Sequence, residues 1–280
     1  MIVRFYGARG SIPVSGKEYL KYGGNTTCVE IRTNDDEIII IDAGSGIRVL
    51  GNRLISEDRF RYTMIFTHAH WDHIMGFPFF QPIYSKKTKI TMYGCPFAQA
   101  SVREIIAKIM APPNFPVKFE DMRAEIIYHE ACEEAFQIKS MSIISIPLSH
   151  PNQGMGYRFS EGGKSFVFLT DNELTFKHEG GVDYAAYLDF SAGADLLVHD
   201  AEFTEEEYEK KTKTWGHSIY RDALRLALDA GAKRFGLFHH NQERSDKALD
   251  EIVTDCRRII KESGKELECF AVHQGLEISL

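Results

Sequence analysis

Four side chains that can bind a metal stand within six residues, directly after a run that is typical of a buried strand. The run Tyr62–Thr67 is apolar and β-branched, and the motif HAHWDH follows it at positions 68–73. His68 and His70 share one face if the strand continues, and a turn then lets Asp72 and His73 approach from another side. Three imidazoles and a carboxylate suit divalent metals such as zinc. The segment therefore predicts a metal site at the end of a strand.

Three further candidate ligands stand where predicted strands give way to loops. His150 follows the apolar run 143–149, Asp171 follows the run 166–170, and His239 follows the run 235–238. Because ligands at strand ends can converge on one edge of a sheet, we expect these side chains to complete the site. His240 stands beside His239 and could exchange roles with it, so the identity of the last ligand stays open at this stage.

The composition is that of an ordinary globular chain and excludes disorder as its main state. The chain has 280 residues, of which 44% are hydrophobic and 26% are charged. Strands are expected in two batches, each followed by helices, which predicts two packed sheets with helices outside them in one domain over residues 1–280. The continuous run Ile38–Ile41 predicts a strand that is buried on both faces.

Charge and cysteine usage limit the partners and the compartment. The net charge is −7, and no apolar run is long enough to cross a membrane. The five cysteines form no CxxC pair, and the start of the chain carries no export signal. We therefore expect a cytoplasmic protein that does not bind membranes and has no disulfide framework, and a homodimer stays open.

The order of these motifs resembles the metallo-β-lactamase superfamily over nearly the whole chain. The resemblance implies a four-layer αββα sandwich with a two-metal site at one edge of the sheets. It implies that one metal is held by His68, His70 and His150, and the other by Asp72, His73 and His239. Asp171 would bridge the two metals together with a water or hydroxide, and Asp42 would support the site without binding metal.

Two features indicate a branch of that superfamily. Common metallo-β-lactamases have a cysteine where Asp171 stands, so β-lactam hydrolysis is disfavoured. The segment 195–203, DLLVHDAEF, and the later Gly216-His217-Ser218 resemble the phosphodiesterase branch, which includes ribonuclease Z. In that branch the corresponding histidine assists phosphodiester cleavage, which implies this role for His217.

The chain departs from ribonuclease Z in one respect. That enzyme carries a long arm that grips tRNA between the third histidine ligand and the aspartate, whereas here Asp171 stands only 21 positions after His150. With no arm and no basic stripe, tRNA is disfavoured as a substrate. A small or cyclic nucleotide phosphodiester is the expected small-molecule substrate.

The sequence thus predicts a dinuclear metal-dependent hydrolase, a phosphodiesterase that acts through a metal-bridging hydroxide. Asp72 and His217 are the predicted catalytic residues. The two divalent ions are expected to be zinc, with manganese and iron as alternatives. Two other interpretations stay open: hydrolysis of a carboxylic ester, thioester or lactone at the same site, and a non-catalytic metal- or nucleotide-binding module.

The residues that bind the substrate stay undefined at this stage. Trp71, Phe77, Phe79 and Phe80 could form an apolar wall for a base, although packing in the core is the favoured interpretation of these aromatic side chains.

Overall fold

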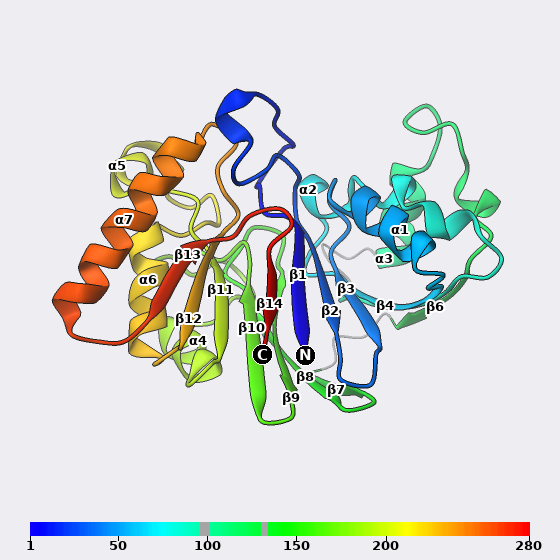
Figure 1. Cartoon of the computed structure of the whole chain (residues 1–280). Helices are drawn as coiled ribbons and strands as arrows, with labels where there is room; N and C mark the ends of the chain where they lie inside the picture. Colours follow the sequence, from blue (N-terminus) through cyan, green and yellow to red (C-terminus); the bar gives the residue numbers. More distant parts are fainter. Residues whose placement is uncertain (96–100, 130–133) are drawn as a thin grey trace.

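Two seven-stranded sheets lie face to face in the computed structural model, which describes residues 1–95, 101–129 and 134–280 (Figure 1). The first sheet has the strand order β14-β1-β2-β3-β4-β5-β6, and the second has the order β13-β12-β11-β10-β9-β8-β7. The strands of the first sheet are β1 (Ile2–Gly7), β2 (Cys28–Arg32), β3 (Ile38–Ile41), β4 (Arg61–Ile65), β5 (Lys89–Tyr93), β6 (Glu125–His129) and β14 (Glu277–Ser279). Those of the second are β7 (Ala135–Ile138), β8 (Met141–Pro147), β9 (Met155–Glu161), β10 (Lys164–Leu169), β11 (Leu196–Asp200), β12 (Arg234–Phe238) and β13 (Glu268–Ala271).

Helices cover the outer face of each sheet, which makes four layers. Helices α1 and α3 pack on the first sheet, and α4, α6 and α7 pack on the second (Figure 1). The α-helices are α1 (Ile47–Ser56), α2 (Trp71–Ile74), α3 (Val102–Ile109), α4 (Tyr184–Ser191), α5 (Glu205–Glu207), α6 (Tyr220–Asp229) and α7 (Asp246–Ser263). Short 3₁₀ or π turns are η1 (Lys17–Tyr19), η2 (Phe77–Phe79), η3 (Gln81–Tyr84), η4 (Phe119–Asp121) and η5 (Tyr208–Thr212). The predicted αββα sandwich is confirmed.

Strand β3 has apolar side chains on both faces, so both faces of its sheet must be packed against other layers. Ile39 and Ile41 pack between the two sheets, whereas Ile38 and Ile40 pack under the helices of the first sheet. Side chains alternate along a strand, so an unbroken apolar run is buried on both faces. The burial predicted for Ile38–Ile41 is therefore confirmed.

The carboxyl ends of the central strands meet at one edge of the sandwich. Strand β3 runs parallel to β4, and β10, β11 and β12 are mutually parallel. Asp42 and His239 directly follow β3 and β12, and Asp171 stands two residues after the end of β10. All three have left-handed backbones, with φ of 60°, 50° and 56° for Asp42, Asp171 and His239. Non-glycine residues in this conformation are strained and cluster at functional sites. The chain thus turns sharply at this edge and leaves polar side chains there.

Two expectations about the chain as a whole have different outcomes. Among the described residues, Cys28, Cys256 and Cys269 are free thiols, whereas Cys95 is disulfide-bonded. The sequence predicted no disulfide framework and did not indicate the bond at Cys95, because cysteines without CxxC spacing can still meet in space. Within the part of the chain that the structure describes, no helix has the length and apolar character needed to span a bilayer.

Two adjacent isoleucines of β8 test the packing between the sheets. Ile143 is fully buried between them, whereas Ile144 is 43% exposed. We expect Ile143→Ala to lower the free energy of unfolding by about 2–5 kcal/mol through the lost contacts and the cavity. The matched control Ile144→Ala should lower it by less than about 1 kcal/mol. Urea denaturation of both variants measures this difference, and equal losses would contradict the sandwich.

Candidate metal centre

The seven side chains predicted as metal ligands lie together at the edge where the central strands end. They form two groups that share one carboxylate, and in each group the ligand atoms lie within 4.8 Å of one another. The first group is His68, His70, His150 and Asp171, and the second is Asp72, His73, Asp171 and His239. Every member except His70 is buried. Residues from both sheets contribute to each group, so the centre bridges the interface between the sheets.

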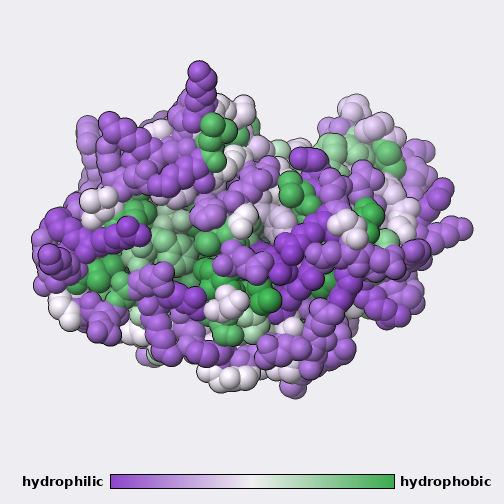
Figure 2. Space-filling view, viewed as in Figure 1, coloured by the Kyte–Doolittle hydropathy of each residue, from purple (hydrophilic) through white to green (hydrophobic). Residues whose placement is uncertain are grey.

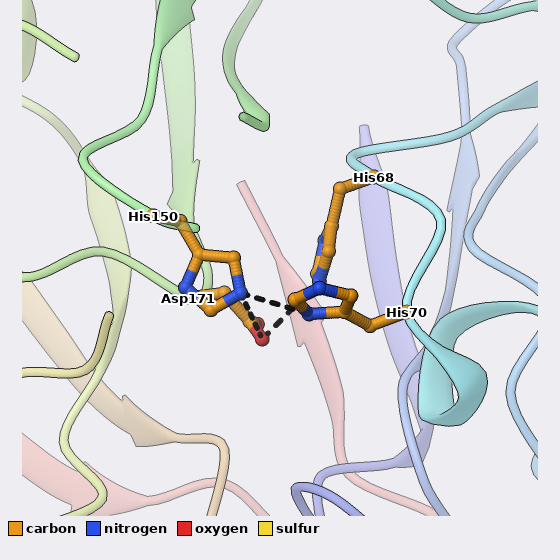
Figure 3. A group of neighbouring side chains, drawn as sticks. All are labelled: His68, His70, His150 and Asp171. Carbon is orange, nitrogen blue, oxygen red and sulfur yellow. Dashed lines mark hydrogen bonds and ion pairs between the residues drawn. The ribbon is translucent and has the colours of Figure 1, made fainter. Parts of the chain in front are cut away.

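The first group brings three imidazoles around the Asp171 carboxylate (Figure 3). His68 and His70 come from the loop after β4, and they face His150 and Asp171 from the second sheet. His150 Nε2 lies 2.9 Å from His70 Nδ1, and His68 Nε2 lies 3.4 Å from Asp171 Oδ2. Three ring nitrogens and a carboxylate oxygen that converge in this way match the ligand types of zinc and related metals.

The second group surrounds the same carboxylate from the other side. His73 Nε2 lies 3.2 Å from Asp171 Oδ1, and His239 Nε2 lies 3.2 Å from Asp171 Oδ2. Asp72 Oδ2 lies 3.0 Å from His239 Nε2 and 3.4 Å from His73 Nε2. It also accepts a hydrogen bond of 2.8 Å from the backbone N–H of Ser11. Both oxygens of Asp171 are thus within reach of cations held in the two groups.

Two ring nitrogens of the centre indicate that the residues fit metal ions. His68 Nε2 and His73 Nε2 are buried, and neither makes a hydrogen bond with any described residue. Leaving a buried polar atom without a hydrogen bond costs about 1–3 kcal/mol. Both atoms point toward Asp171, where a bound cation would satisfy them. The donor set and these two atoms therefore fit a pair of divalent metals.

The far nitrogens of the histidines are held by other groups. Asp42 Oδ2 lies 2.8 Å from His73 Nδ1, and Asp42 itself accepts hydrogen bonds from the backbone N–H and the hydroxyl of Thr67, at 2.8 and 2.7 Å. His150 Nδ1 donates to the carbonyl of Gly216 at 2.8 Å. Such partners fix the ring orientation of a metal-binding histidine. Asp42 thus has the supporting position that the resemblance implied for it.

Two glycines let the backbone approach the histidine rings. A Cβ added at Gly10 would lie 2.3 Å from the ring of His239, and one added at Gly216 would lie 2.2 Å from the ring of His150. Gly216 also has a φ of +92°, which favours glycine. Any side chain at these positions would displace a ring, so both glycines are needed for the geometry of the centre.

His217 lies beside both groups and belongs to neither. Its ring stacks on that of His239 with a centroid distance of 4.7 Å and lies 5.0 Å from that of His150. Its Nδ1 lies 2.8 Å from Asp200 Oδ2 and 3.4 Å from Glu202 Oε2. Burial lowers the pKa of His217, but the charges of Glu202 and Asp200 outweigh it and raise this pKa to about 9.

The carboxylates of the centre stay charged although they are buried. Burial would raise the pKa of Asp171, but His239 and His73 outweigh it and hold that pKa well below its usual value. The pKa of Asp72 is held well below its usual value in the same way, chiefly by His73. Burial lowers the pKa of His70 to about 4. The centre thus offers anionic oxygens together with a neutral imidazole, the form that binds metal.

The structure shows which of the two neighbouring histidines, His239 or His240, lies among the predicted ligands. His239 lies in the second group, whereas His240 points away and its Nε2 donates to the carbonyl of Val272 at 2.8 Å.

Among the aromatic residues, Phe77 and Phe80 are buried as predicted. The core interpretation is wrong for Trp71 and Phe79, which are 62% and 51% exposed, because each is the one exposed residue of a short helix whose other residues are buried.

Three residues around the centre were not singled out by their sequence. Gly10 and the Ser11 amide contact the second group from a loop that is more than 50 residues distant in sequence. Glu202 accepts from His239, and a sequence signal was available for it, since Asp200 is the last residue of β11 and Glu202 stands two positions further on. Gly10 and Ser11 gave no such signal.

The comparison with protein families decides which family the fold and the centre represent. Residues 38–240 match the family model described as "Beta-lactamase superfamily domain". The chain belongs to the β-lactamase superfamily. Ribonuclease Z of Sulfurisphaera tokodaii is 26% identical over 227 residues, which cover 70% of this chain and 75% of the relative. Ribonuclease Z of Haloarcula marismortui is 23% identical over 301 residues, which cover 92% and 91%. The predicted ribonuclease Z-like branch of the superfamily is confirmed.

Solved structures of this superfamily share the fold. The metallo-β-lactamase fold protein YhfI from Bacillus subtilis has a TM-score of 0.73 and 18% identity, with 99% of this chain and 98% of that chain covered. A diphosphatase from the PhnP family has a TM-score of 0.70 and 18% identity, with 100% and 97% covered. The sequence relatives are hydrolases, and the two side-chain groups fit a dinuclear metal site, as predicted.

Asp171 provides the most direct test of the metal centre. Asp171→Asn keeps the size of the side chain and removes the charge that both groups share, so we expect metal content to fall from about two ions per chain to below about one. Elemental analysis after gel filtration measures this content. Asp189→Asn, an exposed change on α4, is the control and should retain the metal. Full metal content in Asp171→Asn would contradict the shared ligand.

Proposed function

We propose that this protein is a dinuclear metal-dependent phosphodiesterase that hydrolyses a small phosphodiester, with a nucleotide or cyclic nucleotide as the substrate class. The observation that carries this proposal is the position of His217. It is fixed by Asp200 and packed against a ring of each metal-binding group, but it is not part of either group. A proton donor beside a pair of metals is what cleavage of a phosphodiester needs.

Two divalent cations held by the two groups would supply Lewis-acid charge and lower the pKa of a water molecule. The residues of the chain then have separate tasks. Asp171 keeps the two groups together, because each of its oxygens faces a histidine of the second group while Oδ2 also faces His68. Asp72, fixed by the Ser11 amide, is placed to orient the attacking nucleophile as well as to bind metal.

His217 would act on the leaving group. Because Nδ1 is held by Asp200 at 2.8 Å, Nε2 is the nitrogen that can donate a proton to a leaving oxygen. Its side chain is 12% exposed, so a substrate can reach it. General acid catalysis of this kind contributes about 10²–10⁴-fold to the rate.

Two sets of observations support a small phosphodiester as the substrate. The relatives named above are ribonucleases, and a fold neighbour is a diphosphatase, so their printed activities are cleavages at phosphorus. The 21 residues from His150 to Asp171 hold β9, β10 and their hairpin turn, which leaves no room for a tRNA-binding arm. The net charge of −7 also disfavours a long polyanion. We therefore favour a small substrate over tRNA, with zinc as the first metal to test.

The two tryptophans of the chain support a base in that substrate. Trp71 adjoins two predicted ligands and is 62% exposed, and Trp215 precedes Gly216 and is 49% exposed. Trp215 packs edge-on against Phe203 at 6.4 Å, and Phe203 packs against His217 at 5.9 Å. Tryptophan is mostly buried in folded proteins, so exposed rings at this place suit stacking on a base.

Replacing His217 tests the proposed reaction. Metal-loaded His217→Ala should bind as much metal as the wild type and hydrolyse bis-p-nitrophenyl phosphate about 10²–10⁴-fold more slowly, because the proton donor is lost. His129→Ala is the control, since His129 belongs to β6, the edge strand of the first sheet, and stacks on Tyr93. Normal turnover by metal-replete His217→Ala would contradict the role of His217.

A p-nitrophenyl carboxylic ester, assayed beside the phosphodiester, separates the reaction classes. We expect the wild type to prefer the phosphodiester. Ester turnover alone, unaffected by His217→Ala, would identify an acyl hydrolase instead. A metal-replete wild type that hydrolyses neither substrate would identify a non-catalytic binding module.

Replacing Trp215 tests the proposed base-binding role. Base stacking on an aromatic side chain contributes about 1–3 kcal/mol, so Trp215→Ala should raise the KM for a nucleotide phosphodiester about tenfold or more. Trp215→Phe should keep most of the affinity because it retains an aromatic ring. Phe60→Ala removes a half-buried ring that packs against Lys87 before the start of β4, the end opposite to the ligands, and serves as the control. An unchanged KM in steady-state assays of Trp215→Ala would contradict the role.

A further inference from the structure

Glu202 is a buried carboxylate that faces two histidines of different proposed function. It is 3% exposed and stands two residues after the end of β11. Its Oε2 lies 3.0 Å from His239 Nδ1 and 3.4 Å from His217 Nδ1. One oxygen atom is thus shared between a predicted metal ligand and the predicted proton donor.

The rest of Glu202 is fixed by hydrogen bonds. Its Oε1 accepts from the Asn241 side chain at 2.7 Å, and its backbone N–H donates to Asp200 Oδ1 at 3.0 Å. Its carbonyl accepts from the Arg244 guanidinium at 3.2 Å. The side chain has little freedom to turn, so the position of Oε2 determines where the two imidazoles can lie.

The two imidazoles are also coupled directly to each other. Their rings are nearly parallel, with an angle of 15° between their planes and a centroid distance of 4.7 Å. His239 uses Nε2 toward Asp72 and Asp171 and Nδ1 toward Glu202. A rotation of the His239 ring would therefore disturb the second metal group, the contact with Glu202 and the stacking on His217 together.

The four residues Asp200, Glu202, His217 and His239 could also be considered as a third metal-binding group, because their ligand atoms lie within 4.8 Å of one another. Their atoms already have partners, however. His217 Nδ1 is paired with Asp200, and His239 Nδ1 is paired with Glu202. The other oxygen of Asp200 accepts from the Glu202 amide. A hydrogen-bonded positioning network describes this group better than a cation site does.

We propose that Glu202 is a positioning residue that couples the second metal group to the proton donor. Through Oε2 it orients His239, which would bind metal, and it positions His217, which would donate the proton to the leaving group. This inference rests on the proposed function, and it adds that both halves of the catalytic apparatus depend on one carboxylate.

Two other carboxylates of the chain each pair with a histidine of only one kind, a metal-binding one or the proton donor, which gives matched controls. Asp42 contacts His73 Nδ1 at 2.8 Å and belongs to the metal side. Asp200 contacts His217 Nδ1 at 2.8 Å and belongs to the proton-donor side. Replacing each of the three by its amide keeps the size and removes the charge. An amide –NH₂ at position 202 would also oppose the N–H of an imidazole.

The experiment compares Glu202→Gln, Asp42→Asn and Asp200→Asn in two measurements. Zinc affinity is measured by competition with a chelator, and catalysis at saturating metal is compared for phosphodiesters with good and poor leaving groups. We expect Glu202→Gln to lose about 10–100-fold in zinc affinity and to slow the poor leaving group more than the good one. Asp42→Asn should show only the first effect and Asp200→Asn only the second.

Each alternative outcome of this experiment overturns the coupling. If Glu202→Gln loses zinc affinity alone, or leaving-group dependence alone, Glu202 serves one half and not both; if neither changes, it positions neither. Asn241→Ala removes an anchor of Glu202 and should show both effects in weaker form, which keeps the test available if Glu202→Gln does not fold. If the wild type cleaves no phosphodiester, the proposed function fails, and the coupling is then judged by zinc affinity and by the NMR signals of the His217 ring, which Glu202→Gln should shift.

Discussion

The contact on which the rest of the centre depends is the Asp171 carboxylate, which lies between two groups of histidines. His68 and His73 reach it from the first sheet, and His150 and His239 reach it from the second. A buried charge is tolerated only when opposite charge and hydrogen bonds surround it. The geometry of the centre therefore depends on how the two sheets pack, because neither sheet holds a complete group of ligands.

Several features around Asp171 hold the metal-binding side chains in place. Three residues with left-handed backbones turn the chain at the strand ends, and the two glycines at positions 10 and 216 let the loops close on the histidine rings. Carboxylates outside the two groups hold the far nitrogens of the rings. This arrangement leaves His217 as a histidine that is fixed in place, partly open to a substrate and free of a role in either group, which is the basis of the proposed phosphodiesterase activity.

Local patterns predicted two packed sheets and candidate ligands at one edge of them, whereas the grouping of those ligands around two metals was implied by the resemblance to the superfamily. The HAHWDH motif and the polar residues after apolar runs are readable without tertiary structure, and parallel strands bring such residues to one edge. The choice between His239 and His240, the exposure of Trp71 and the contact of Gly10 with His239 are set by contacts between distant segments. The contact of Glu202 with both His239 and His217 could not be predicted from the sequence for the same reason, although its spacing from Asp200 placed it at the correct edge.

Crystals of the zinc-loaded protein, measured on both sides of the zinc absorption edge, would test the central claim most directly. The account predicts two anomalous peaks with Asp171 between them, one beside His68, His70 and His150, and one beside Asp72, His73 and His239. A single peak, or a second peak beside Asp200 and His217 in place of the one beside Asp72, would contradict the shared-carboxylate centre.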